Sequence, residues 1–179
     1  MTNSTAPNGA STSAGPPPAT AAEAWLASAH PSPDTVRRDW DGENLLALVP
    51  LGRRFDAVRL HEHLVHHVAG TSDRDAVNSW LGFTLSCGPV IHDPKRRCYY
   101  ALVPPGTAKG WRGPAKAKEC LGEGFYLGVP RVGLTEPGLI VQRSYWAVPV
   151  TRPEWLCKTH EVLSLVEVCR YATDDGEDR

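Results

Sequence analysis

Long apolar runs are absent from this chain of 179 residues, and no stretch approaches the roughly 20 residues that a membrane-spanning helix needs. No lysine or arginine precedes Arg37, and no apolar segment follows the start of the chain, so the pattern of a secretory signal is also missing. We therefore expect a cytoplasmic protein with no membrane partner. In that reducing compartment the five cysteines are expected to be free thiols.

Charged side chains are absent from the first 22 residues, which consist mainly of Ala, Ser, Thr, Pro, Gly and Asn. Such a segment buries too little apolar surface to offset the entropy cost of ordering it. We expect residues 1–22 to form a disordered arm, residues 23–173 to form one domain, and residues 174–179 to form a solvated acidic tail. With 41% hydrophobic residues, the chain is long enough for one core and short for two.

Acidic residues are absent between Lys95 and Lys118, although the formal net charge of the whole chain is only -1. We call this segment the basic strip. It combines lysine and arginine with aromatic residues, a pattern typical of proteins that bind single-stranded nucleic acid, because cations neutralise phosphates and rings stack on bases. The predicted contacts are Lys95, Arg96, Arg97, Tyr100, Lys109, Trp111 and Arg112. The alternative is a solvated hairpin tip, in which Tyr99 or Tyr100 packs into the core.

The segment Cys87–Gly106 predicts a β-hairpin. Residues 89–91 and 99–103 contain β-branched and aromatic side chains, and Asp93-Pro94 between them favours a chain reversal. Further strands are predicted at 45–50, 55–60, 125–129 and 144–148. Three helices are also predicted: one at 61–68, one capped by Ser72 and one that starts at Pro153. Strands interleaved with helices indicate an α+β or mixed α/β fold.

Four histidines lie close together in His61–His67, which reads HEHLVHH. On a helix, His63 and His67 share one face at i and i+4, the spacing of zinc-binding helices. The glutamate that a zinc hydrolase of that type places between its histidines is missing, and a third ligand has to come from Asp56, His92 or His160. A metal-dependent hydrolase built on this cluster is therefore an alternative to a solvated histidine face.

The cysteines are spaced too widely for a CxxC zinc pair or redox motif. Cys87, Cys98 and Cys169 lie in apolar runs, which favours core packing. A nucleophilic cysteine with His92 or His160 as its base is the alternative.

Glycine, proline and aromatic landmarks follow one another between Leu45 and Ala172. They are Val49–Val58 (VPLGRRFDAV), Gly88–Val90, Tyr99–Thr107 (YYALVPPGT), Trp111, Leu121-Gly122, Tyr126–Pro130, Trp146 and Pro149. This succession resembles the short actinobacterial relatives of the N-terminal domain of bifunctional DNA primase/polymerases (prim-pol). The resemblance implies a single prim-pol-like domain with a role in DNA replication or mobile-element biology.

Active prim-pol domains hold two metal ions with a pair of acidic residues one apart on a strand, and phosphoryl transfer depends on them. At the matching place this chain has Asp56 followed by Ala57 and Val58, and Tyr99 lies near the position of the family's nucleotide-binding histidine. The resemblance therefore predicts a module that has lost catalysis and needs no cofactor. Asp56 is the one candidate for a catalytic residue or a magnesium ligand. His63 and His67 are the candidate zinc ligands.

We therefore predict a regulatory module that binds nucleic acid or a nucleotide. The nucleic acid predicted to bind the basic strip is single-stranded. The alternative of a different class is a protein-interaction module whose arm or acidic tail recruits a protein partner.

Overall fold

A computed structural model describes residues 20–112, 119–138 and 142–174 of the chain. The expected α+β class is confirmed. The elements in chain order are α1 (Ala21–Ala27), α2 (Pro33–Asp41), β1 (Leu46–Pro50), β2 (Asp56–His61), α3 (Glu62–Ala69), α4 (Arg74–Thr84), β3 (Val90–Asp93), β4 (Cys98–Val103), α5 (Thr107–Gly110), β5 (Cys120–Leu121), β6 (Tyr126–Pro130), β7 (Tyr145–Val148) and α6 (Thr159–Asp174). Within the described ranges, no helix has the length and apolar character to cross a membrane.

Two antiparallel sheets form the centre of the molecule. β1 pairs with β6, and the larger sheet has the strand order β5-β2-β4-β3-β7. The predicted hairpin is present, with Val90 of β3 opposite Ala101 of β4 and Asp93 opposite Cys98. Arg97 closes its turn at a φ of 52°, a left-handed conformation that is uncommon for a residue with a side chain.

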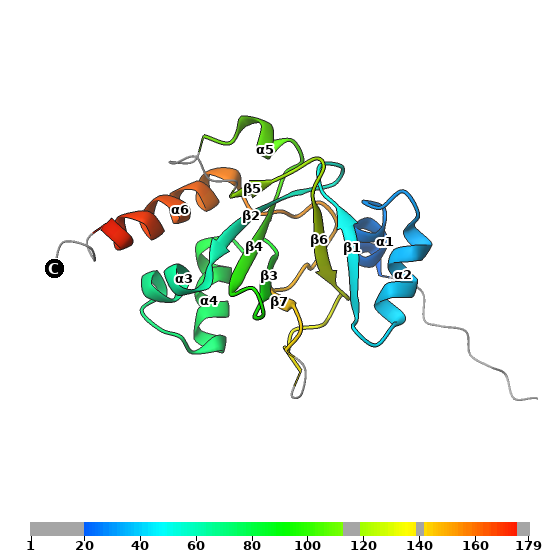
Figure 1. The fold of residues 1–179 in the computed structure, drawn as a ribbon, viewed down its shortest axis with the longest axis horizontal. Coiled ribbons are helices and arrows are strands. Elements are labelled where there is room, and N and C mark those ends of the chain that lie inside the picture. The colour runs from blue at the N-terminus through cyan, green and yellow to red at the C-terminus, as the bar shows by residue number, and fades with distance from the viewer. Residues whose placement is uncertain (1–19, 113–118, 139–141, 175–179) are drawn as a thin grey trace, which may run out of the picture.

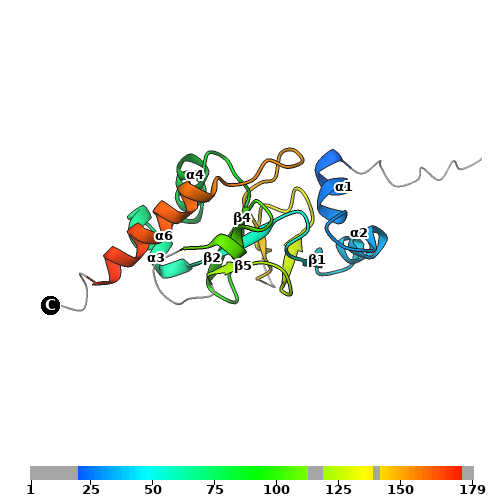
Figure 2. The same ribbon diagram turned by 90° about the horizontal axis from the view of Figure 1, so that it is seen from above.

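Helices cover the sheets from opposite ends of the molecule. Figure 1 shows α3, α4 and α6 on one side of the five-stranded sheet, and α1 and α2 beyond β1 at the other end; Figure 2 shows the same separation from above. Because side chains alternate along a strand, β4 contributes to two cores. Tyr99 and Ala101 belong to the core under α3, α4 and α6, which we call the helix-side core. Tyr100 and Leu102 face the inter-sheet core, to which α1 and α2 also contribute.

Two tryptophans connect the elements of the inter-sheet core. Trp146 of β7 donates its indole N–H toward the carbonyl oxygens of Pro130 and Arg131, each at 3.2 Å, where β6 ends. Trp40 of α2 donates to the carbonyl oxygen of Val129 at 2.9 Å. The two-stranded sheet is therefore held to the larger sheet on one side and to α2 on the other, which fixes the space between the sheets.

The structure corrects several predicted boundaries. The expected arm reached residue 22, but Thr20 caps α1 in a capping box with Glu23, and Ala22 is buried. Residues 1–19 of that arm and residues 175–179 of the acidic tail lie outside the described residues. Asp73, rather than Ser72, caps α4 by accepting from the Ala76 N–H at 2.9 Å. The last helix begins at Thr159, later than expected from Pro153.

Candidate nucleic-acid interface

A basic hollow with a volume of about 400 Å³ forms a cleft between the two sheets. Three of its lining residues are basic and one is acidic: Lys95, Arg96 and Arg143 against Asp93. Its opposite wall is apolar and comes from the β1-β6 sheet, through Leu46, Leu48, Leu127 and Gly128. We refer to these as the basic wall and the apolar wall.

The hairpin turn positions the first two cations of the basic wall. The Asp93 carboxylate accepts the Arg96 N–H at 3.2 Å, so the single acid of the cleft is occupied in shaping the turn. Burial raises the pKa of the Tyr100 phenol, and the neighbouring Arg96 partly opposes this. Tyr100 is 5% exposed and thus forms the floor of the cleft rather than a free ring.

Arg143 completes the basic wall from a segment that sequence reasoning did not select. It precedes β7, and its guanidinium donates to the carbonyl oxygen of Glu43 at a long 3.4 Å, which leaves its charge without a carboxylate partner in the described structure. Because β7 pairs with β3, Arg143 is brought beside the hairpin turn. No local sequence signal marks it, since it lies outside the basic strip.

The other predicted contacts are not gathered in this cleft. Arg97 lines a pocket on the opposite face of the larger sheet and pairs with Glu62 at 3.5 Å. Lys109 pairs with Glu123 at 3.2 Å, and it lies with Arg112 around α5. Trp111 is half-buried against the helix-side core, with its indole nitrogen buried. The fold thus divides the basic strip into a cleft portion and a remote portion.

The pocket around Arg97 contains a polar cluster centred on His92. The His92 Nε2 lies 3.0 Å from a Glu62 carboxylate oxygen and its Nδ1 lies 2.9 Å from the Tyr145 hydroxyl. Burial lowers the pKa of His92, although Glu62 opposes this, so the ring is neutral, donates to Glu62 and accepts from Tyr145. Its ring also stacks on Tyr99 at 4.1 Å. Both nitrogens are occupied, which leaves neither for a metal or for base catalysis.

The remaining histidines and cysteines are separated. His63 and His67 are exposed on α3, and among the described residues no group of three His, Cys, Asp or Glu side chains is placed to hold a metal ion. Cys98 donates its thiol to the Arg96 carbonyl oxygen at 3.2 Å, and burial raises its pKa. His61 lies 3.9 Å from that sulfur, too far to activate it strongly.

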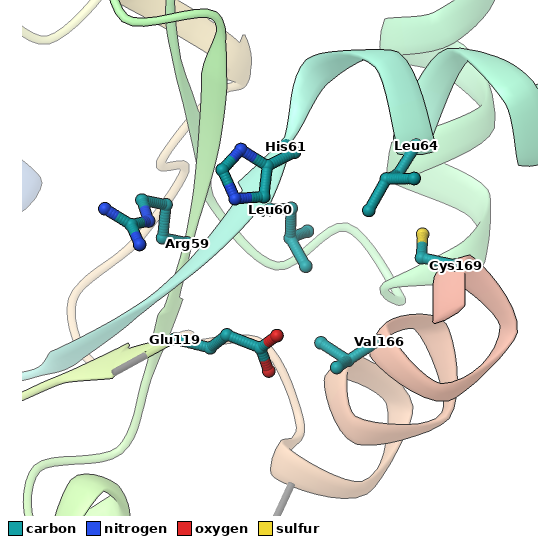
Figure 3. A pocket seen from close by; sticks show the side chains of 7 residues that line it. All are labelled: Arg59, Leu60, His61, Leu64, Glu119, Val166 and Cys169. Atoms are coloured by element: carbon teal, nitrogen blue, oxygen red, sulfur yellow. The ribbon is translucent and has the colours of Figure 1, made fainter. Parts of the chain in front are cut away.

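Cys169 lies at a small gap between β2, α3 and α6, where Figure 3 shows it with Leu64 and Val166. The gap measures about 20 Å³, enough for about one water molecule. Burial raises the pKa of Cys169 to about 11, so its thiol is protonated near neutral pH. We interpret this gap as a packing defect between elements rather than a ligand site.

Asp56, the candidate catalytic residue, lies away from the cleft. It is 1% exposed, and its Oδ2 accepts the Ala108 N–H at 2.8 Å. Val58 and Leu60 follow it on the face of β2 that packs under the helices, whereas Ala57 faces the inter-sheet core. Asp56 therefore supports the loop between β4 and α5.

Burial raises the pKa of Asp56 above its ordinary value of 3.8, despite the opposing effect of the Ala108 and Gly106 N–H groups. A raised pKa means that folding favours the neutral acid. The contribution of Asp56 to stability is then full below about pH 3.8 and declines as the pH rises through the higher folded-state pKa.

The Asp56→Asn variant keeps an acceptor for Ala108 and does not titrate. Its free energy of unfolding is expected to rise relative to wild type between about pH 3 and pH 6. Urea denaturation of both proteins across that range checks this, and a difference that is constant or falls with pH contradicts it.

Comparison of the chain with protein-family models, with curated proteins and with solved structures finds no match in any of the three. The relationship to prim-pol domains therefore stays a prediction from the sequence.

Proposed function

We propose that this chain is a cytoplasmic, non-catalytic module of the prim-pol type that binds nucleic acid or a nucleotide in the cleft between its two sheets. The observation that carries the proposal is the basic wall, in which Lys95 and Arg96 from one turn and Arg143 from a distant segment converge on one hollow. Cations from separate segments repel one another when the fold brings them together. An anionic ligand relieves that repulsion.

Phosphate is the anion that best suits this wall. Two guanidinium groups offer paired N–H donors to phosphate oxygens, and a lysine adds a point charge. The volume of about 400 Å³ is in the range of small-ligand sites, which run from about 300 to 1,000 Å³. Asp93 is the only acid among the lining residues, and it is turned to the backbone N–H of Arg96. Little therefore opposes the approach of a phosphate.

The absence of catalysis is supported by the position of Asp56. A two-metal phosphoryl transfer needs carboxylates at the bound phosphates. Asp56 is the first residue of β2 and accepts from the Ala108 N–H of α5, away from the cleft, and the residue two positions later is Val58, fully buried in the helix-side core. The purified protein is accordingly expected to leave a primed template unextended with magnesium or manganese. Extension that disappears in Asp56→Ala contradicts this part of the proposal.

The test of binding uses a labelled oligothymidylate and fluorescence anisotropy at several salt concentrations. If three cations contact phosphates, log affinity is expected to fall with log salt at a slope near about -2, from roughly 0.7 per contact on a single strand. The triple variant with Lys95, Arg96 and Arg143 changed to Ala is expected to flatten that slope to near zero and to weaken binding most at low salt.

A matched triple variant controls for net charge. Changing Arg97, Lys109 and Arg112 to Ala removes the same charge from the remote portion of the strip. This control is expected to keep most of the slope, because none of the three lines the cleft. Equal effects of the two triples indicate a diffuse electrostatic surface, and no binding by wild type at low salt favours a protein-interaction module instead.

A further inference from the structure

We propose that the cleft takes single-stranded nucleic acid with its bases on Leu48 of the apolar wall and on the neighbouring Tyr126, which together provide the stacking surface. The inference rests on the proposed function, since it assumes phosphates on the basic wall. It assigns the aromatic role to a residue outside the basic strip.

Tyr126 and Leu48 are unusually exposed for large side chains in strands. Tyr126 is 64% exposed and Leu48 is 63% exposed. A single exposed apolar residue is ordinary, but two on one face of a two-stranded sheet form a contiguous surface. Exposure of this kind beside a basic wall indicates a ligand with both anionic and flat apolar parts, and a nucleotide chain has both.

The strand register places Tyr126 on the same sheet face as Leu48 and Gly128, one strand step beyond the residues that line the cleft. Leu48 is opposite Gly128, and Pro50 is opposite Tyr126. Leu48 and Gly128 line the cleft, and residues two apart share one face of a strand, so Tyr126 faces the same way as Gly128. Its position is diagonal to Leu48, at a separation that an aromatic side chain spans. The step from Gly128 to Tyr126 is about 7 Å along the strand.

The intervening glycine keeps this surface flat. A Cβ at Gly128 would lie 3.1 Å from Leu46 Cδ2, so the Leu46 side chain lies over the glycine, and a larger residue there would collide with it. Leu46, Leu48 and Tyr126 therefore share one sheet face, against which a base can lie.

The aromatic residues of the basic strip do not offer such a surface. Tyr100 is 5% exposed and Trp111 packs against the helix-side core. Stacking on Tyr126 needs a base whose face is free, which a paired duplex does not provide along its length. The arrangement therefore selects single strands over duplexes.

The experiment compares three probes of equal length, a labelled oligothymidylate, an abasic oligonucleotide and a duplex, against wild type, Tyr126→Ala and Tyr126→Phe. Tyr126→Ala is expected to weaken oligothymidylate binding by about 5- to 140-fold, the range of one stacked base, while the salt slope stays unchanged. Tyr126→Phe keeps the ring and is expected to bind within about twofold of wild type. On the abasic probe, which retains the phosphates, Tyr126→Ala and wild type are expected to bind equally.

The outcomes separate this inference from the proposed function. If Tyr126→Ala binds oligothymidylate as wild type does while the cleft triple variant loses its salt slope, phosphate binding stands and the stacking surface is elsewhere. If Tyr126→Ala weakens the abasic and oligothymidylate probes alike, the tyrosine acts on the fold or on phosphates, and the inference is wrong. Absence of binding to every probe by wild type removes the proposed function itself.

Discussion

Replacing Trp146 with alanine is expected to lower the free energy of unfolding by about 3–5 kcal/mol. The side chain is 1% exposed, and its indole N–H donates toward the carbonyl oxygens of Pro130 and Arg131 at 3.2 Å. The variant therefore leaves a large cavity between the sheets and removes a donor from buried carbonyl groups. Because domains are typically stable by about 5–15 kcal/mol, this single change approaches the limit that the fold tolerates.

Trp155 provides a matched control for this change. It is 36% exposed, and its ring lies 3.9 Å from the Arg152 guanidinium carbon. Trp155→Ala is expected to cost at most about 1 kcal/mol, the usual value of an exposed cation-π contact. Urea denaturation followed by circular dichroism compares the two variants. Similar losses in both would show that Trp146 does not connect the sheets as described, whereas Trp146→Phe is expected to fall between Trp146→Ala and wild type.

The Gly88→Ala variant is expected to lose stability at the upper end of the range for overpacked cores, about 1–3 kcal/mol. A Cβ at this position would lie 2.6 Å from both the Cα and the Sγ of Cys157. The Cα cannot move aside alone, because the Cys157 N–H donates to the Leu102 carbonyl oxygen at 2.8 Å. The methyl group would therefore push the chain that leads into α6 away from β4.

Gly110→Ala is the control for this second change, because a Cβ there meets nothing within 4 Å. We expect its free energy of unfolding to lie within about 0.5 kcal/mol of wild type. The melting temperatures of both variants and wild type decide the matter. A Gly88→Ala protein as stable as Gly110→Ala would mean that the Cys157 segment shifts freely.

Local chemistry in the sequence predicted most strands correctly. The hairpin follows from β-prone residues on both sides of Asp93-Pro94, and both strands formed where expected. Boundaries differed by a residue or two where competing caps are adjacent, as at Ser72 and Asp73. α1 and α2 received no prediction, although Thr20 with Glu23 and Pro33 at a helix start are recognisable signals.

The candidate site was predictable only in part. Lys95, Arg96 and Tyr100 are adjacent in the hairpin, so the sequence placed them together without knowledge of the fold. Arg97 departs from them because its backbone is left-handed at the end of the turn and its guanidinium pairs with Glu62 on the other face of the sheet. Trp111 was expected to be free, yet it packs against the helix-side core. A run of basic residues in the sequence shows that these residues are neighbours in the chain. It does not show which face of the fold each side chain reaches.

The sequence by itself determined the α+β class, the hairpin, the local excess of positive charge and the apolar residues Ala57 and Val58 after Asp56, since all four depend on residues within a few positions of one another. Only the tertiary structure decided that Arg143 joins Lys95 and Arg96, and that Tyr126 shares a sheet face with Leu48 and Gly128, which line the same cleft. These contacts arise from the pairing of β7 with β3 and of β6 with β1. Such pairings form between residues far apart in the chain, where burial and backbone hydrogen bonding across the whole domain, rather than local preference, select the partner.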